Sequence, residues 1–222
     1  MDIEFLCDDA SVIEHFPIKP ANKVVPEWYK DLPAWKKNPM QGIDAPTIKG
    51  CMPAQDMMLS GYIIFNTYET ILHPEDDSRY EGFKVSTAMK PYVNSHHHEQ
   101  CPVAIQGKKK HYFKLAQPWT IKTPPGYSCL FLQPFYFFED RYRLLPAIVD
   151  TDQHDLSVEI PGYSTTMDDI KIESGSPLVQ VIPFKRDDWV MKITEKPRTR
   201  SRLEFMLNAA YRTVFHKKKS FR

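Results

Sequence analysis

The sequence has little glycine and cysteine and almost no net charge. Its 222 residues include 8 glycines and 4 cysteines, and the formal net charge is +1. A chain so close to neutrality is no polycation, which excludes nucleic-acid binding through overall charge alone. The cysteines form no C-x-x-C pair, so the spacing of a structural zinc knuckle is absent. Isolated cysteines in a chain of this length fit reduced thiols in the cytosol, and no spacing indicates a disulfide.

Long apolar runs are also missing. None approaches the roughly 20 residues that span a bilayer. The N-terminal sequence MDIEFLCDDA is acidic and lacks the apolar centre of a signal peptide. We therefore expect a soluble, cytoplasmic protein with no membrane partner.

Proline and aromatic residues are abundant instead. The 19 prolines argue against a mostly helical chain, because proline breaks helix interiors. The segment 119–186 holds several short apolar runs, rich in β-branched and aromatic residues and bounded by Gly, Pro or Asp. This pattern is typical of strands and turns. The sequence predicts a mainly β fold, with a distorted β-barrel or jelly-roll-like (β-clip-like) core.

We expect a single domain, 1–222, in three parts. Residues 1–56 form a Pro-rich extended arm, 57–195 the β core, and 196–222 a C-terminal helix with a basic tail. Trp28, Tyr29 and Trp35 either pin the arm onto the core or form an aromatic patch for a ligand or partner.

Two local elements are predicted near the start of the core. Tyr62–Tyr68 has the composition of a buried strand, 73–78 that of a turn, and Phe83–Ala88 that of a returning strand, which together predict a hairpin. Tyr112–Leu115 is expected to be a further short strand.

The C-terminal region follows a helical period. Leu203, Leu207, Ala210 and Val214 recur at helical spacing, which predicts a helix from about 198 to 216 with this face buried on the sheet. Residues 196–222 contain nine Lys or Arg and one acidic residue. The cations near the helix end complement its dipole, which is the favoured interpretation. The alternative is a patch for nucleic acid or an acidic partner.

Metal-ligand residue types gather at His96, His98 and Glu99. In a strand, alternate residues face the same way, so the two histidines would share a face and, with the carboxylate, suit a divalent metal. A third, distant ligand would come from His111, His154 or Asp152. The favoured interpretation is a solvated loop, and no cofactor is assigned.

A carboxylate cluster follows an apolar strand. Asp150, Asp152 and Asp155 lie beside His154. Carboxylates at a strand end can act as a general base or bind a cation. They also close strands through Asx turns, which is the interpretation we favour here.

Three stretches resemble the dUTPase and dCTP deaminase families. They are Pro125–Tyr127, Ala147–Asp150 and Ile172–Ile182. The resemblance implies a compact distorted β-barrel, with Asp150 at the position of the water-activating Asp and Gln180 at that of a phosphate-contacting Gln. Together with Asp152 and His154, these residues define a candidate pocket.

The chain departs from those families in three ways. Residues 127–146 lack the Arg-Ser-Ser phosphate motif, and Gln153 stands where a uracil-stacking Tyr is expected. A basic helix is expected in place of a Gly-rich C-terminal arm. The resemblance therefore supports a related β architecture and argues against that catalysis.

A second resemblance extends over most of the chain. The stretches Val25–Lys30, Thr47–Pro53, Trp119–Phe131 and Gln180–Arg186 are similar to an uncharacterised family from large tailed phages of marine bacteria, including cyanobacteria. The resemblance implies a phage protein in the host cytoplasm or the virion. It implies no activity, because none is established for that family.

We interpret the chain as a phage-type, non-catalytic binding or assembly protein, for which a homo-oligomer is a compatible state. The alternative is an enzyme with a metal or nucleotide site in the mouth of the barrel. Convergence of His96, His98, Asp150 and Gln180 on one pocket would separate the two.

Overall fold

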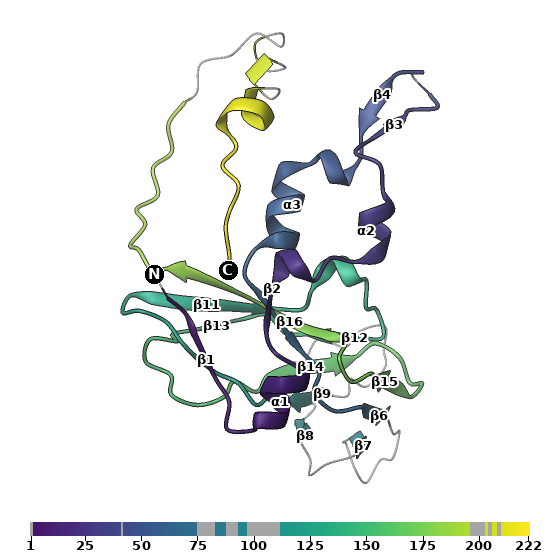
Figure 1. Cartoon of the computed structure of the whole chain (residues 1–222), viewed down its shortest axis with the longest axis vertical. Helices are drawn as coiled ribbons and strands as arrows, with labels where there is room; N and C mark the ends of the chain where they lie inside the picture. Colours follow the sequence, from purple (N-terminus) through teal and green to yellow (C-terminus); the bar gives the residue numbers. More distant parts are fainter. Residues whose placement is uncertain are drawn as a thin grey trace.

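The computed structural model describes residues 2–40, 42–74, 83–87, 93–96, 112–195, 203, 206–207 and 210–222. Short antiparallel strands dominate these residues (Figure 1). The mainly β class predicted from the sequence is confirmed. Among the described strands the ladders divide into five sheets, and closure into one barrel is not shown.

The strands have the following bounds: β1 Glu4–Leu6, β2 Lys19–Pro20, β3 Trp35–Lys37, β4 Asp44–Pro46, β5 Tyr62–Phe65, β6 Thr70–Pro74, β7 Phe83–Thr87, β8 Val93–His96, β9 Tyr112–Leu115, β10 Thr120–Lys122, β11 Tyr127–Leu132, β12 Tyr142–Leu144, β13 Ala147–Val149, β14 Ile160–Ser164, β15 Ile170–Ile172 and β16 Pro177–Lys185. The helical elements are α1 Ala10–His15, η1 Ala21–Lys23, α2 Glu27–Asp31, η2 Ile48–Gly50, α3 Met52–Leu59, η4 Phe135–Phe137 and the π-helical η5 Tyr211–Phe215.

The largest sheet contains β11 and β16, the two strands that position the candidate site residues. Its strand order is β13-β11-β16-β5-β2. β11 and β16 are antiparallel, with Tyr127 opposite Lys185 and Leu132 opposite Gln180. One end of β11 therefore lies beside the end of β16, and the other lies beside its middle.

The remaining strands form smaller sheets. β12, β14, β9 and β8 make a four-stranded sheet, and β15, β6 and β7 a three-stranded one. One cluster of buried side chains joins the sheets, with Phe113, Phe131 and Val179 almost fully buried. Burial of large apolar side chains of this kind contributes most of the folding free energy.

The N-terminal segment is built into the sheets rather than extended beside them. β1 pairs with β10, and β2 pairs with β5. α3 runs from Met52 to Leu59, across the boundary expected at 56/57. Figure 1 shows α2, α3 and the β3–β4 hairpin on one side of the sheets.

The predicted hairpin exists with a different first strand. β6 pairs with β7 in an antiparallel ladder, whereas the strand expected over Tyr62–Tyr68 ends at Phe65. The chain bends at the buried Asn66, whose amide donates to the carbonyls of Tyr68 and Ile172. An Asn side chain that bonds to nearby carbonyls stabilises a bend, which explains the early end. The strand predicted at Tyr112–Leu115 is confirmed as β9.

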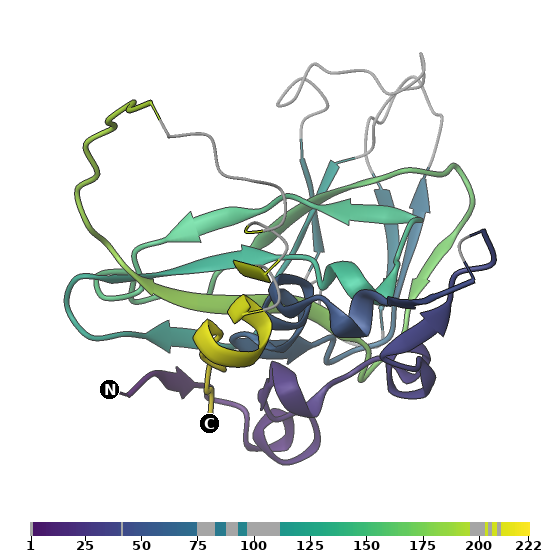
Figure 2. The same cartoon turned by 90° about the horizontal axis from the view of Figure 1, so that it is seen from above.

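The predicted burial of the C-terminal helical face is wrong. Residue 203, residues 206–207 and residue 210 are helical, but the side chains of Leu203, Leu207 and Val214 are 48%, 49% and 71% exposed. Helical spacing predicts which side chains lie on one face, but it does not predict what that face contacts. Here the chain leaves the sheet at the end of β16 (Figure 2). The side chains of residues 187–195 are exposed. Within the described part of the chain, no helix is long and apolar enough to cross a membrane.

Candidate functional site

A carboxylate–guanidinium cluster lies where β11 begins and β13 and β16 end. The guanidinium of Arg186 donates to both carboxylate oxygens of Asp152 at 2.8 and 2.5 Å, and its Nη1 lies 3.0 Å from Asp150 Oδ1. Ser128 Oγ donates to Asp150 Oδ1 at 2.7 Å, and the backbone N–H of Gly126 donates to Asp152 Oδ2 at 2.8 Å. The two aspartates therefore join three chain segments.

The electrostatics of this cluster favour charged carboxylates. The hydroxyl of Ser128, followed by Arg186, lowers the pKa of Asp150. Arg186, followed by the N–H of Gly126, lowers the pKa of Asp152. A carboxylate stabilised by such donors is a weak proton acceptor.

The chain makes a turn at Asp150. The N–H groups of Gln153 and His154 both donate to the carbonyl of Asp150 at 2.9 Å. His154 is half-buried in this turn, and Asp155 forms an ion pair with Lys122. The arrangement supports the interpretation of these aspartates as residues that close a strand.

Replacing Asp152 with asparagine should reduce the acid sensitivity of the fold. A carboxyl whose folded pKa is depressed stabilises the protein above its unfolded pKa, near 3.9, and this stabilisation is lost as pH falls through the folded pKa. We expect Asp152→Asn to lower stability at pH 7 and to flatten the decline between neutral and acidic pH. Urea unfolding at both pH values would measure this. The exposed Asp8→Asn is the control, and equal flattening in both variants would contradict the role of Asp152.

Gln180 lies elsewhere. It is 3% exposed within β16, and its amide donates to the carbonyls of Met57 and Ser60 at 2.8 and 2.7 Å. It precedes Arg186 by six residues, which is about 20 Å of extended strand. Asp150 and Gln180 therefore do not converge on one pocket, and the Gln180 amide is bonded to backbone carbonyls of the chain.

The predicted metal ligands lie mostly outside the described residues. His96 ends β8, and His98, Glu99 and His111 are not described. In the described ranges, no three His, Cys, Asp or Glu side chains are grouped so that they could hold a metal ion. The metal site at His96, His98 and Glu99 stays a prediction.

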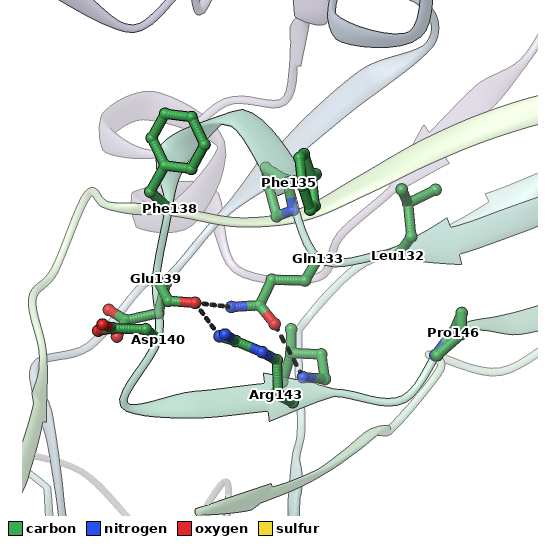
Figure 3. Close-up of a pocket in the computed structure, with 10 residues that line it drawn as sticks. Leu132, Gln133, Phe135, Phe138, Glu139, Asp140, Arg143 and Pro146 are labelled. Carbon is green, nitrogen blue, oxygen red and sulfur yellow. Dashed lines mark hydrogen bonds between the residues drawn. The ribbon is translucent and has the colours of Figure 1, made fainter. Parts of the chain in front are cut away.

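A pocket of about 660 Å³ lies beyond the other end of β11 (Figure 3). We name it the aromatic pocket. Its apolar lining residues are Leu132, Pro134, Phe135, Phe138, Leu144 and Pro146. Its polar lining residues are Gln133, Glu139, Asp140 and Arg143. A largely apolar pocket of this volume with a few polar groups is typical of a binding site.

The turn after β11 displays the two pocket phenylalanines. Phe138 has a left-handed backbone (φ 54°), and its N–H donates to the carbonyl of Phe135 at 3.2 Å. The rings of Phe135 and Phe138 lie 6.2 Å apart, and both are exposed. The indole N–H of Trp28 donates to the carbonyl of Tyr136 at 2.9 Å, and the Trp28 ring packs 5.2 Å from Phe138. The N-terminal segment therefore supports this turn.

Hydrogen bonds fix the polar side of the pocket. Gln133 Oε1 accepts from the N–H of Leu144 at 3.0 Å, and Arg143 donates to the carbonyl of Glu139 (Figure 3). Arg141 forms a bidentate contact with the Glu139 carboxylate at 2.9 and 2.6 Å. Burial raises the pKa of Glu139, but the contacts with Arg141 outweigh burial and lower it. Among the described residues, the exposed carboxylate of Asp140 has no hydrogen bond or ion pair.

An apolar segment follows β16 at the opposite end of the sheet. We use this name for residues 187–195, which have no regular secondary structure. The side chains of Trp189, Val190, Met191 and Ile193 are 85–94% exposed. A contiguous exposed apolar stretch marks an interaction surface.

Sequence reasoning missed both features. Residues 135–138 are aromatic, but the turn they form contacts Trp28, which is distant in sequence. Residues 187–195 have ordinary composition, and only the structure shows that they are exposed.

Comparisons with known proteins give no family. No family model matches the sequence, and no curated protein matches it. Among solved structures, the native dUTPase of EIAV is 9% identical, with a TM-score of 0.36, and the match covers 63% of this chain and 87% of that one. A mutant dUTPase from phage phi11 of S. aureus is 12% identical, with a TM-score of 0.37, covering 63% and 86%. At these values a similarity identifies neither a family nor an activity.

Proposed function

We propose that this chain is a non-catalytic assembly protein, in which the apolar segment of one copy docks in the aromatic pocket of a second copy. The observation that carries the proposal is the exposed run at Trp189, Val190, Met191 and Ile193. Burying one such side chain stabilises a complex by about 1.5–3 kcal/mol. Several together would drive association.

The reach of the chain favours a second copy as the partner. Arg186 is anchored to Gly126 and Asp152, next to Tyr127. Trp189 is three residues further on and reaches at most about 10 Å. The pocket begins at Leu132, five residues along β11 from Tyr127, or about 17 Å. The backbone at Trp189 therefore falls short of the pocket of its own chain, which favours a second copy as the partner.

The charges are complementary. Lys192 lies between Met191 and Ile193 in the apolar segment. The pocket offers the carboxylate of Asp140, which has no ion pair within the described residues. A lysine beside apolar side chains, facing a carboxylate beside phenylalanines, would set the register of docking.

Assembly is favoured over the enzyme alternative because the predicted catalytic side chains are otherwise engaged. The carboxylates of Asp150 and Asp152 are bonded to Arg186, and Gln180 is bonded to backbone carbonyls. Neither arrangement supports a poised general base or a phosphate contact.

Replacing Trp189 with serine should weaken association at least tenfold. Loss of about 2 kcal/mol of apolar burial exceeds the 1.4 kcal/mol that corresponds to a factor of ten. Sedimentation velocity over a range of concentrations would measure it. Met40→Ser, which removes an equally exposed apolar side chain from the β3–β4 hairpin, is the matched control.

A charge reversal tests the docking site itself. Lys192→Asp and Asp140→Lys should each weaken association, and the double variant should restore it, because the contact joins two copies. Monomeric wild-type protein at all concentrations would refute the proposal, as would an equal effect of Trp189→Ser and Met40→Ser.

We also propose that the assembly belongs to a phage, in the virion or the host cytoplasm. The four stretches similar to the uncharacterised phage family support this. Mass spectrometry of purified particles and of the soluble lysate would locate the chain, and finding it in uninfected cells would reject a phage origin.

A further inference from the structure

A second pocket, of about 590 Å³, lies between the N-terminal helices and the C-terminal tail. We name it the basic pocket. Its walls come from η1, α2, η2, α3 and the tail, residues 216–222. Figures 1 and 2 both show the tail beside α3. It is distinct from the aromatic pocket and has no lining residue in common with it.

Specific contacts hold the tail against the body. His216 Nε2 lies 3.0 Å from Asp56 Oδ2, on α3. The hydroxyl of Tyr62 donates to the carbonyl of Arg222 at 3.3 Å, and the rings of Tyr62 and Phe221 lie 6.0 Å apart. The tail is therefore a defined wall of the pocket.

Lysines dominate the charge of the basic pocket. Those that line it are Lys23, Lys49, Lys218 and Lys219. Asp56 is its one lining carboxylate, and it is bonded to Lys219 and His216. Burial raises the pKa of Asp56, but these two partners outweigh burial and lower it. Among the described residues, Lys23, Lys49 and Lys218 have no ion pair, so the pocket carries uncompensated positive charge.

Two lining residues carry buried polar atoms without a hydrogen-bond partner in the described structure. These atoms are the hydroxyl of Tyr29 and Oδ1 of Asn22. Tyr29 is 6% exposed. Burial raises the pKa of Tyr29 and outweighs the Gln55 amide, which can donate to the phenol oxygen and lowers the pKa, so the hydroxyl keeps its proton and has no acceptor for it among the described residues. Buried polar groups without partners are rare, and a ligand that supplies partners accounts for them.

We propose that the basic pocket binds a phosphate-type anion, with the lysines supplying the charge and Tyr29 a neutral hydrogen-bond donor. Lysine ammonium groups and hydroxyls are ordinary phosphate ligands. A phosphate group also has an ionisable hydroxyl, which could donate to Asn22 Oδ1. The pocket has room for a phosphate monoester, and the bound anion would hold the tail on the body.

Calorimetric titration of the full chain with pyrophosphate tests the proposal. We expect saturable binding that the double variant Lys23→Gln, Lys218→Gln weakens at least tenfold. Tyr29→Phe should also weaken binding, with the aromatic ring and the fold retained. The matched control is Lys36→Gln, Lys37→Gln, which removes two exposed lysines from the β3–β4 hairpin and should leave the dissociation constant unchanged.

A second probe distinguishes a free phosphate group from a nucleic-acid backbone. A single-stranded oligonucleotide without terminal phosphates should not compete with pyrophosphate, because its phosphodiesters are blocked on both sides. Competition by the oligonucleotide would overturn the proposal. Non-saturating binding would also overturn it, as would equal weakening in both double-lysine variants, since either result indicates general surface charge.

Discussion

Replacing Gly61 with alanine should destabilise the fold by roughly 3 kcal/mol or more. Gly61 joins the end of α3 to the start of β5 with a left-handed backbone (φ 73°). An added Cβ would lie 2.0 Å from the carbonyl oxygen of Val181 and 3.0 Å from Ile182 Cα. Both contacts are with the backbone of the central strand β16, which cannot move aside as a flexible side chain could.

A second glycine distinguishes the cost of backbone strain from the cost of the steric clash with β16. Gly42, in the β3–β4 hairpin, also has a left-handed backbone (φ 69°), but an added Cβ meets nothing within 4 Å. Gly42→Ala should therefore lose only about 1–2 kcal/mol through backbone strain. Chemical unfolding of both variants measures the difference. Equal losses would show that the contact with β16 is relieved by a shift of the chain and would contradict our account.

The strands were predictable because their side chains obey local rules. β16 is rich in β-branched residues and β11 in aromatic and other apolar residues, and positions such as Phe131 and Val181 are buried as the pattern requires. β14 was less predictable from its sequence. Its Pro161-Gly162 pair resembles a turn, yet both residues lie in the strand. Glycine fits at 162 because an added Cβ would lie 2.7 Å from the ring of Phe113.

The pockets could not be predicted, because their residues converge from distant parts of the chain. His216 meets Asp56 across 160 positions, and no local spacing encodes that contact. Trp28 supports the turn at Phe138 in the same way. The candidate pocket of Asp150 and Gln180 rested on motifs that describe local sequence, whereas strand register places these two residues at separate points along the sheet.

Replacing Gln180 with leucine should cost about 2–3 kcal/mol of stability, because two carbonyls would lose their donor. The carbonyls belong to Met57, in the last turn of α3, and to Ser60, just after it. Helices leave their last carbonyls without intrahelical partners, and here a side chain from β16 supplies the donor. A ligand-contacting Gln180 would instead lose binding with stability unchanged, and that result would contradict the structural role.

The variant Gln180→Glu tests the donor role of Gln180 through the pH dependence of stability. A buried carboxylate would face two carbonyl oxygens, so its folded pKa should rise above the unfolded value near 4.3. A carboxyl with a raised folded pKa destabilises the folded state least when it is protonated, at pH values below its unfolded pKa. The variant should therefore lose stability as pH rises from acidic to neutral. We expect Gln180→Glu to be more destabilised, relative to wild type, at pH 7 than at pH 5, as measured by urea unfolding. The exposed Gln153→Glu is the control and should show no such dependence. Equal pH dependence in the two variants would mean that the amide of Gln180 is not the donor that fixes α3 to the sheet.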